Sequence, residues 1–546
     1  MRVRTTTLAL ALVAVGAFPA AAQVTPGTVP GTFQGPTSSQ TPFVVPAADG
    51  WEVVSLISAG DPAKNNGYRM VGIPDGLGAV AGKFEAGRWG RYVADEKYMT
   101  VFMNHEIPAG GGIARAHGQN GAFVSQWTIQ LNTLQVKAGE DLIQDVYTWD
   151  TASGQYVFNP TAQFNRFCSA DLAEFTAFYN PRTGKGFYGR LFMNGEEAGN
   201  EGRAFAHVIT GSGKGDSYQL ASLGRLSYEN SVASPNSGDK TLVVSMDDST
   251  PGQVYVYLGN KQKTGNPVER AGLVGGKLFG IKVTNGGTNY SGAAVTRENN
   301  GPINGAFSLV EVSDAATGTG AVLQTTSTTR GITEFARPED GAWDTLNPRV
   351  FYFVITGATI DGKLQSARLY KLTFNSITNP TGGTIEPVID RADLLPSTTG
   401  FAQFDNLTVD SDGFVLIQED PGNQAYLAQT WRVNPATKTA TAIFHSDAAR
   451  FGSPAPAPFN LDEESSGIIE VTDIVRSARW YEHGRRYFLA DMQAHYAISG
   501  ELFEGGQLYL LASPKAPRRH FDDDDDDRGR DNGGWDNDHH GHDDED

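Results

Sequence analysis

The sequence predicts an all-β protein, a six-bladed β-propeller followed by a disordered acidic C-terminal tail. Glycine accounts for 64 of the 546 residues, and short apolar runs recur at fairly even intervals, among them Tyr98–Asn104, Val350–Thr356 and Phe414–Gln418. Such a pattern is typical of short strands joined by tight turns. Several runs are too apolar for a strand with one wet face, so we expect sheets covered on both sides. Stacked four-stranded blades provide that cover, and residues 50–512 would hold about six of them.

The start of the chain resembles an export signal. Arg2 and Arg4 form a basic start, an apolar run covers Leu8–Phe18, and three alanines precede Gln23. This order of segments is typical of a signal peptide over residues 1–22, and the apolar run is too short to span a bilayer. We therefore expect a cleaved, periplasmic or secreted protein without a transmembrane segment, and a poorly ordered segment over residues 23–49.

The end of the chain, residues 513–546, is rich in Asp and His. Between Asp522 and Asp546 there are thirteen acids and two arginines, so much of the net charge of −19 lies in this tail. Self-repulsion and the scarcity of apolar residues predict disorder. The tail could collect cations or only keep the protein soluble. No basic stripe is present, so we expect no nucleic-acid partner, and we expect a monomer.

Acidic residues repeatedly follow the apolar runs of the proposed propeller. Corresponding strand ends of successive blades can converge on one mouth of a propeller, and a cluster of buried anions is tolerable only when cations lie among them. Each position alone is more often a solvated strand end or turn, but the recurrence of five such positions favours a shared metal centre. The segments are Asn104-His105-Glu106, Glu196-Glu197, Asp247-Asp248, Glu419-Asp420 and Asp491.

Two further features could carry chemistry. Cys168 is the only cysteine, so in an exported chain it is either an inert core thiol or a group kept for its reactivity. In Arg337-Pro338-Glu339 the arginine could hold a phosphate through two parallel hydrogen bonds, and the carboxylate could hold a cation. The motif Asp462–Gly467 and the segment Gln493-Ala494-His495 have no catalytic explanation in the sequence alone.

The order of these motifs resembles that of the PhoX family of alkaline phosphatases over roughly residues 60–500. The motifs that carry the resemblance are Asn104-His105-Glu106, Ala116-His117-Gly118 with Val124-Ser125, Cys168, Gly195-Glu196-Glu197, Leu223-Gly224-Arg225 through Glu229, Asp247-Asp248-Ser249, Arg337-Pro338-Glu339, Phe404-Asp405-Asn406 and Gln418-Glu419-Asp420. The chain departs from the family pattern after Cys168, where a Gly-rich turn is replaced by Ser169-Ala170-Asp171, and at Asn406, where the family tends to have glycine.

The resemblance implies a six-bladed propeller whose mouth holds iron and calcium and hydrolyses small phosphomonoesters. It implies that Cys168 is a catalytic thiolate ligand of iron beside Glu229, that Glu339 is a further metal ligand, and that Arg337 clamps the phosphate. The carboxylates that it implies for holding calcium or bridging the metals are Glu196, Asp248, Asp405 and Asp420. The alternative from another class is a non-catalytic, calcium-stabilised propeller that acts as a cell-surface or binding module.

Overall fold

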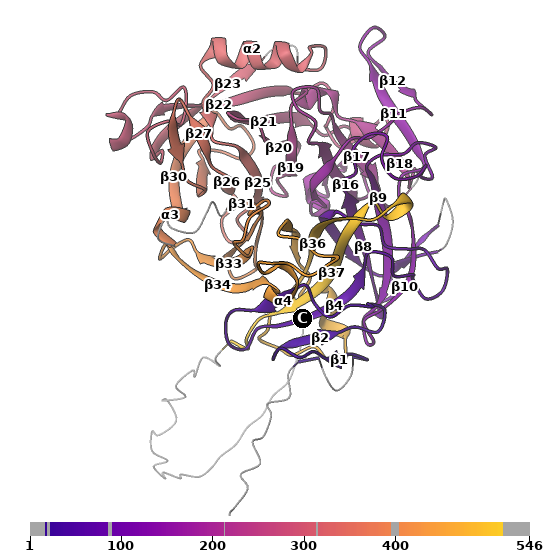
Figure 1. Cartoon of the computed structure of the whole chain (residues 1–546). Helices are drawn as coiled ribbons and strands as arrows, with labels where there is room; N and C mark the ends of the chain where they lie inside the picture. Colours follow the sequence, from indigo (N-terminus) through magenta and orange to yellow (C-terminus); the bar gives the residue numbers. More distant parts are fainter. Residues whose placement is uncertain are drawn as a thin grey trace, which may run out of the picture. The chain divides into compact units, whose positions relative to one another are not determined.

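The computed structural model describes residues 17–18, 22–85, 90–211, 213–312, 315–394 and 403–516, and these residues are mostly β-structure (Figure 1). Met1–Lys515 form one compact unit and Ala516–Asp546 a second. Most of the expected signal peptide and the tail beyond residue 516 lie outside the described residues. None of the described helices combines the length and hydropathy needed to cross a bilayer.

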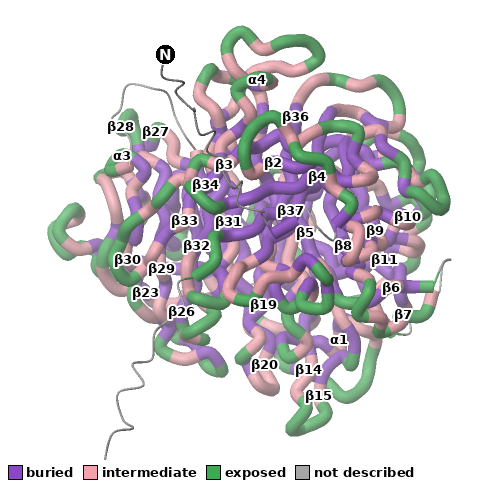
Figure 2. The backbone as a smooth tube through the Cα atoms, turned by 90° about the horizontal axis from the view of Figure 1, so that it is seen from below, coloured by how far each residue is buried: buried purple, intermediate pink, exposed green. Residues whose placement is uncertain are grey.

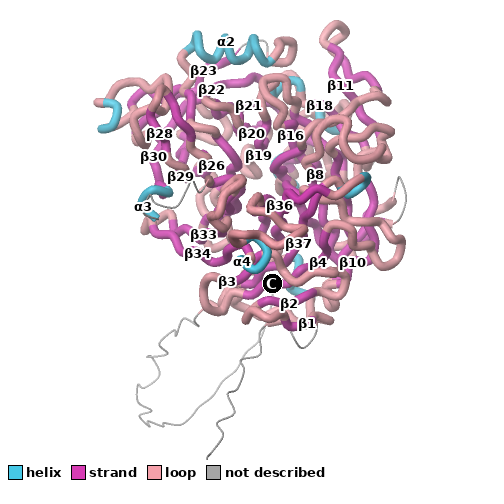
Figure 3. The backbone as a smooth tube through the Cα atoms, in the orientation of Figure 1, coloured by secondary structure: helices cyan, strands magenta, loops and turns pink. Residues whose placement is uncertain are grey.

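Six antiparallel four-stranded units make up most of the described part of Met1–Lys515. Strands are coloured magenta in Figure 3. Within each of the six, the innermost strand is named first and the outermost last. The first three units are β5(Pro74–Ala81), β8(Tyr98–His105), β9(Phe123–Gln130) and β10(Gln135–Asp141); β13(Phe167–Asp171), β16(Leu191–Glu196), β17(Ala204–Val208) and β18(Asp216–Gln219); and β19(Tyr228–Ala233), β20(Lys240–Asp247), β21(Gly252–Asn260) and β22(Lys277–Asn285).

The other three units follow the same plan. They are β25(Pro338–Trp343), β26(Val350–Ile355), β29(Arg368–Phe374) and β30(Gly382–Asp390); β31(Phe404–Val409), β32(Val415–Glu419), β33(Gln429–Asn434) and β34(Thr439–Ser446); and β35(Glu463–Glu470), β36(Tyr487–Ala497), β37(Glu504–Ala512) and β4(Glu52–Ser58). Additional strands extend or join these sheets. These are β11(Asp145–Asp150) and β12(Gln155–Phe158) beside β18, and β23(Gly305–Val312) between β22 and β30.

The six inner strands contact one another in a closed order. β5 lies against β13, β13 against β19, β19 against β25, β25 against β31, β31 against β35, and β35 against β5. The last unit combines the N-terminal strand β4 with the C-terminal strands β35–β37, so pairing between the two ends of the chain closes the ring. In Figure 2 the tube is purple along these strands and green mainly at the connecting turns.

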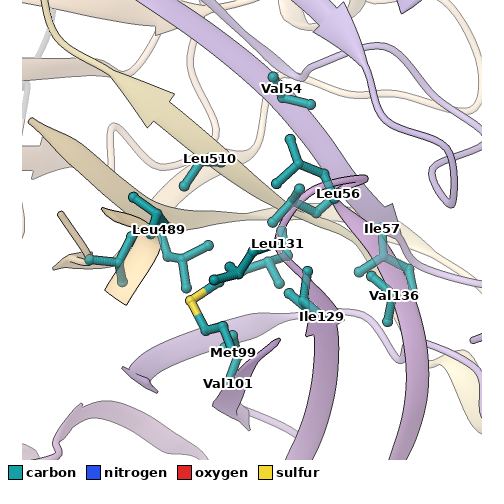
Figure 4. Close-up of a cluster of buried hydrophobic side chains, with 14 of the residues drawn as sticks. Val54, Leu56, Ile57, Met99, Val101, Ile129, Leu131, Val136, Leu489 and Leu510 are labelled. Carbon is teal, nitrogen blue, oxygen red and sulfur yellow. The ribbon is translucent and has the colours of Figure 1, made fainter. Parts of the chain in front are cut away.

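Neighbouring sheets pack face to face through apolar side chains, as the sequence pattern predicted. Between the last and the first unit, Val54 and Leu56 of β4 and Leu489 of β36 pack in one cluster with Met99 and Val101 of β8 (Figure 4). All five are at most 1% exposed. Each such side chain contributes about 1.5–3 kcal/mol relative to an exposed position, so this interface makes a substantial contribution to the stability of the ring closure.

The segment over residues 23–49, which we expected to be poorly ordered, instead takes part in the sheets. Its strands are β1(Thr25–Pro26), β2(Thr32–Gln34), which pairs with β4, and β3(Val44–Pro46), which pairs with β34.

Helices are few and lie between strands: α1(Pro267–Arg270), α2(Gly320–Arg330), α3(Arg391–Leu394) and α4(Ala448–Phe451). The short strands β6(Lys83–Phe84), β7(Tyr92–Val93), β14(Tyr179–Asn180), β15(Lys185–Gly186), β24(Glu334–Phe335), β27(Ala358–Ile360) and β28(Lys363–Gln365) complete the described elements of this kind.

Candidate metal centre

The inner strands share a β-bulge at or near the end where they begin. In five of them the bulge follows the first paired residue, and the next residue carries a carboxyl or thiol group. These five residues are Asp75, Cys168, Glu229, Glu339 and Asp405. In β35 the bulge begins at Ser465, and the adjacent Ser466 donates a hydrogen bond to Glu464 at 2.7 Å. Because bulges re-aim side chains, the repeat turns one polar group from each inner strand toward its neighbours.

A second ring of polar residues comes from the strand beside each inner strand. Each member directly follows the residue that pairs with the start of the bulge: Glu106, Glu197, Asp248, Thr356, Asp420 and Gln493. In the first five the backbone N–H donates to the residue just before the inner strand, for example Glu106 to Ile73 at 3.0 Å and Glu197 to Arg166 at 2.9 Å. Because all five residues make this same backbone hydrogen bond, they occupy structurally equivalent positions in their units.

Together with Glu464, residues of the two rings form three groups, and within each group the ligand atoms lie within 4.8 Å of one another. The first contains Asp75, Glu106 and Cys168, and it alone offers a thiol. The second joins Glu229, Glu339 and Asp405, and the third joins Asp405, Asp420 and Glu464. The inner strands approach closely here, since a Cβ on Gly76 would lie only 2.3 Å from the backbone nitrogen of Ala170.

Cys168 is buried among carboxylates. Its Sγ donates to Oδ2 of Asp75 at 3.4 Å and also interacts with the carboxyl group of Glu229. Burial, followed by the negative charges of Asp75 and Glu229, raises the pKa of the thiol well above its usual value. The thiol is therefore protonated at neutral pH without a cation, and a bound cation would favour the thiolate.

The carboxylates of the cluster also resist ionisation. Burial is the largest cause that raises the pKa of Asp75, Glu229, Glu339 and Asp405 well above the ordinary range, and neighbouring carboxylates raise it further. Glu229 Oε1 and Asp405 Oδ1 are buried without a hydrogen-bond partner among the described residues. Unpartnered oxygens in a site with so many acids fit divalent cations, which satisfy both the oxygens and the charge.

Two arginines lie among these acids. Arg337 donates from Nε to Oδ1 and from Nη2 to Oδ2 of Asp248, each at 2.7 Å, and its Nη2 is 3.2 Å from Oε1 of Glu339. Arg166 forms ion pairs with Glu106 and Glu197. Both arginines directly precede an inner strand and adopt the left-handed backbone conformation, with φ of 63° at Arg337 and 47° at Arg166.

The segments Asp462–Gly467 and Gln493-Ala494-His495, which had no catalytic explanation in the sequence alone, contribute side chains to this cluster. The amide Nε2 of Gln493 donates to Asp75, Glu106 and Glu464 at 3.1, 2.7 and 3.2 Å. His495 lies 2.8 Å from Glu504 and 3.6 Å from Glu464. Burial disfavours the charge on His495, but hydrogen bonds with Glu464 and Glu504 outweigh it and raise its pKa to about 11. These groups orient the carboxylates, as supporting residues do around metal ligands.

Of the residues singled out from the sequence, the structure brings Cys168, Glu229, Asp248, Arg337, Glu339, Asp405 and Asp420 together. Glu196 lies elsewhere. Its two carboxylate oxygens accept from Arg203 at 2.6 and 2.7 Å, and the adjacent Glu197 occupies the second-ring position. Alternation along β16 turns successive side chains to opposite faces, so a shift of one residue exchanges a carboxylate of the second ring for one that pairs with Arg203.

Sequence reasoning missed Asp75, Arg166 and Glu464 as members of this site. A signal for Asp75 was present, since an apolar residue followed by an acid also opens β25 and β31 as Pro338-Glu339 and Phe404-Asp405. A signal for Arg166 was present as well, since Arg166 and Arg337 each stand two residues before a predicted ligand, Cys168 or Glu339. Beyond the bulges, the inner strands line a cavity of about 620 Å³ with both apolar side chains, such as Leu77, and polar ones, such as Asp171 and Asp340.

Among solved structures, the chain is similar to PhoX of Pseudomonas fluorescens in complex with vanadate, a transition state analogue. The TM-score is 0.55 with 12% identity, and the match covers 88% of this chain and 97% of that one. The similarity shows a PhoX-like fold of the β-propeller kind. A sialidase from Trypanosoma rangeli (TM-score 0.31, 9% identity, 85% and 59% covered) and a putative 6-phosphogluconolactonase from Bacteroides fragilis (0.26, 11%, 64% and 81%) are too distant to support an argument. Comparison with protein-family models gave no match, and neither did comparison with curated proteins.

Proposed function

We propose that the protein is a metal-dependent phosphatase of PhoX type that hydrolyses small phosphomonoesters, and that its six four-stranded units are the blades of a six-bladed propeller. The observation that carries the proposal is the position of Arg337 beside Glu339 and Asp248, at a cluster of buried carboxylates and one thiol. An arginine beside bound cations can both orient a phosphate ester and neutralise the charge on its oxygens. The PhoX-like fold supports the same reaction class.

The composition of the three groups suggests which cations they would hold. Asp75, Glu106 and Cys168 would take iron, because a thiolate favours a softer transition metal over calcium. The two all-carboxylate clusters that share Asp405 would take calcium. Bound there, the cations would neutralise charge on the phosphate oxygens and lower the pKa of water.

The side chains of the chain itself would prepare this site for the ester. Arg337 would orient the phosphoryl group through guanidinium N–H donors other than the pair that holds Asp248. Asp248 holds that guanidinium through two hydrogen bonds, and Thr356 donates to Glu339, so both groups are fixed before the substrate arrives. Gln493 fixes Asp75, Glu106 and Glu464 in the same way. We also propose that the protein is exported to the periplasm or secreted, and acts as a monomer.

The test uses the protein recovered from its natural compartment. Elemental analysis should find calcium and about one equivalent or more of iron, and the protein should hydrolyse p-nitrophenyl phosphate. Cys168→Ser should lose both the iron and the activity, because a hydroxyl is a poor ligand for a soft metal. Full activity in this variant would contradict the role of Cys168. Protein that binds only calcium and hydrolyses no phosphoester would favour the non-catalytic binding module.

A further inference from the structure

Arg166 is the positional counterpart of Arg337. Each arginine directly precedes the first paired residue of an inner strand, β13 for Arg166 and β25 for Arg337. Each carbonyl accepts a hydrogen bond from a second-ring residue, Glu197 for Arg166 at 2.9 Å and Thr356 for Arg337 at 3.0 Å. A positive φ is uncommon for a residue with a side chain, and both arginines adopt it, as does Ile73 before β5.

The two guanidinium groups nevertheless occupy separate parts of the cluster. Arg166 pairs with Glu106 and Glu197, whereas Arg337 pairs with Asp248 and Glu339, and the two sets have no member in common. The whole inner strand β19 lies between β13 and β25 in the closed order. Arg166 is therefore available to an anionic group other than the phosphoryl group that Arg337 would hold.

Arg166 is also the more accessible of the two. Its side chain is 44% exposed, compared with 30% for Arg337. Both of its ion pairs are made by Nη2, and a guanidinium has five N–H donors, so most of the donors are not engaged in these contacts. The paired carboxylates hold the head group in place, which reduces the entropy cost of binding a ligand.

We propose that Arg166 is a specificity residue that binds a second anionic group, a carboxylate or phosphate, on the alcohol part of the substrate. The preferred substrates are then phosphomonoesters that carry such a group, and the inference rests on the proposed phosphatase function. It assigns Arg337 to the reacting phosphoryl group and Arg166 to the remainder of the molecule. The alternative is that Arg166 only balances the charge of Glu106 and Glu197.

A matched pair of esters separates these roles. 3-Phosphoglycerate and glycerol 3-phosphate share a carbon skeleton and differ by a carboxylate in place of a hydroxymethyl group. The wild-type metal-loaded protein should have the higher kcat/KM for 3-phosphoglycerate. Arg166→Gln should lower the ratio of the two kcat/KM values by about tenfold or more, because the loss for 3-phosphoglycerate should exceed that for glycerol 3-phosphate by the size expected for one charge-assisted hydrogen bond. Arg166→Lys should retain part of the ratio.

Arg297→Gln is the matched control, because Arg297 is 39% exposed and also pairs with two carboxylates, Glu334 and Asp361, outside the cluster. It should leave the ratio unchanged. An equal loss of kcat/KM for both esters in Arg166→Gln, or a loss of bound metal, would overturn the inference and assign Arg166 to charge balance, while the phosphatase function would stand. If the wild-type protein hydrolyses neither ester nor p-nitrophenyl phosphate, the proposed function fails and this inference fails with it.

Discussion

Arg337 and Asp248 meet in a two-point ion pair, with Nε to Oδ1 and Nη2 to Oδ2 both at 2.7 Å. The side chain of Asp248 is 4% exposed and that of Arg337 is 30% exposed. The buried carboxylate thus fixes a guanidinium that still reaches solvent. A fixed guanidinium presents its donors in a defined plane, which a flexible lysine cannot reproduce.

We therefore predict that Arg337→Lys lowers kcat/KM for p-nitrophenyl phosphate by about 100-fold, within the range found for lost transition-state hydrogen bonds. Steady-state kinetics on metal-loaded protein would measure the change. Arg432→Lys is the control, since Arg432 is similarly exposed at 28% and pairs with a buried carboxylate, Asp410. Equal losses in the two variants would mean that Arg337 acts only through stability.

A second prediction distinguishes the neighbouring acids Glu196 and Glu197. Glu197→Gln should lower kcat/KM by about tenfold or more, because it removes a charge from the cluster next to Arg166. Glu196→Gln should keep kcat/KM within about threefold, but it breaks the partly buried pair with Arg203 and should cost up to about 3–5 kcal/mol of unfolding free energy. Kinetics and urea unfolding of both variants would test this pair, and the reverse assignment of effects would refute the register argument.

Glu196 and Glu197 also illustrate which features of the structure could be predicted from the sequence and which could not. The apolar runs at Tyr98–Asn104 and Val350–Thr356 predicted β8 and β26 to within one residue, because strand periodicity and burial are local properties. The choice between Glu196 and Glu197 was not local. It depends on where β16 pairs with β13 around a bulge, and this register is set by contacts between strands.

Asp75 was missed for a related reason. It lies 93 residues from Cys168 in the chain, and only the packing of β5 against β13 brings the two within hydrogen-bonding distance. By contrast, the segments Asp247-Asp248 and Glu419-Asp420 were noticed because they follow apolar runs, and the family resemblance then selected Asp248 and Asp420. The ring of inner strands therefore explains both the successes and the omissions of the sequence reasoning.

A third prediction concerns removal of the cations. Burial, followed by the charge of Glu464, raises the pKa of Asp420 to about 7, and burial raises the pKa of Asp75, Glu229, Glu339 and Asp405. Cations bind the ionised carboxylates and compete with protons, so their stabilising effect should grow as pH rises. Calcium added to chelator-treated protein should raise Tm more at pH 8 than at pH 5. A shift independent of pH, measured by differential scanning fluorimetry, would contradict a carboxylate site.

The last prediction concerns Asp171, at the other end of β13 from Cys168. Its Oδ2 accepts from the backbone N–H of Ala233 at 2.8 Å, but burial is the larger effect and raises the pKa of the carboxyl group to about 7. In the unfolded chain this group titrates near pH 4, so between about pH 4 and 7 the folded state holds a proton that the unfolded state releases. This residue therefore makes the folded state less stable as pH rises through that window, and the loss is complete above about pH 7.

Asp171→Asn removes the titration while keeping a side-chain oxygen that can accept from Ala233. Relative to the wild-type protein, the variant should gain stability progressively from pH 4 to pH 7, and the difference should then level off. Urea midpoints at one-unit intervals from pH 4 to pH 8 would measure the trend in calcium-saturated protein. A difference between the wild-type protein and Asp171→Asn that stays constant over the whole range would show that the carboxyl group of Asp171 ionises normally in the folded protein.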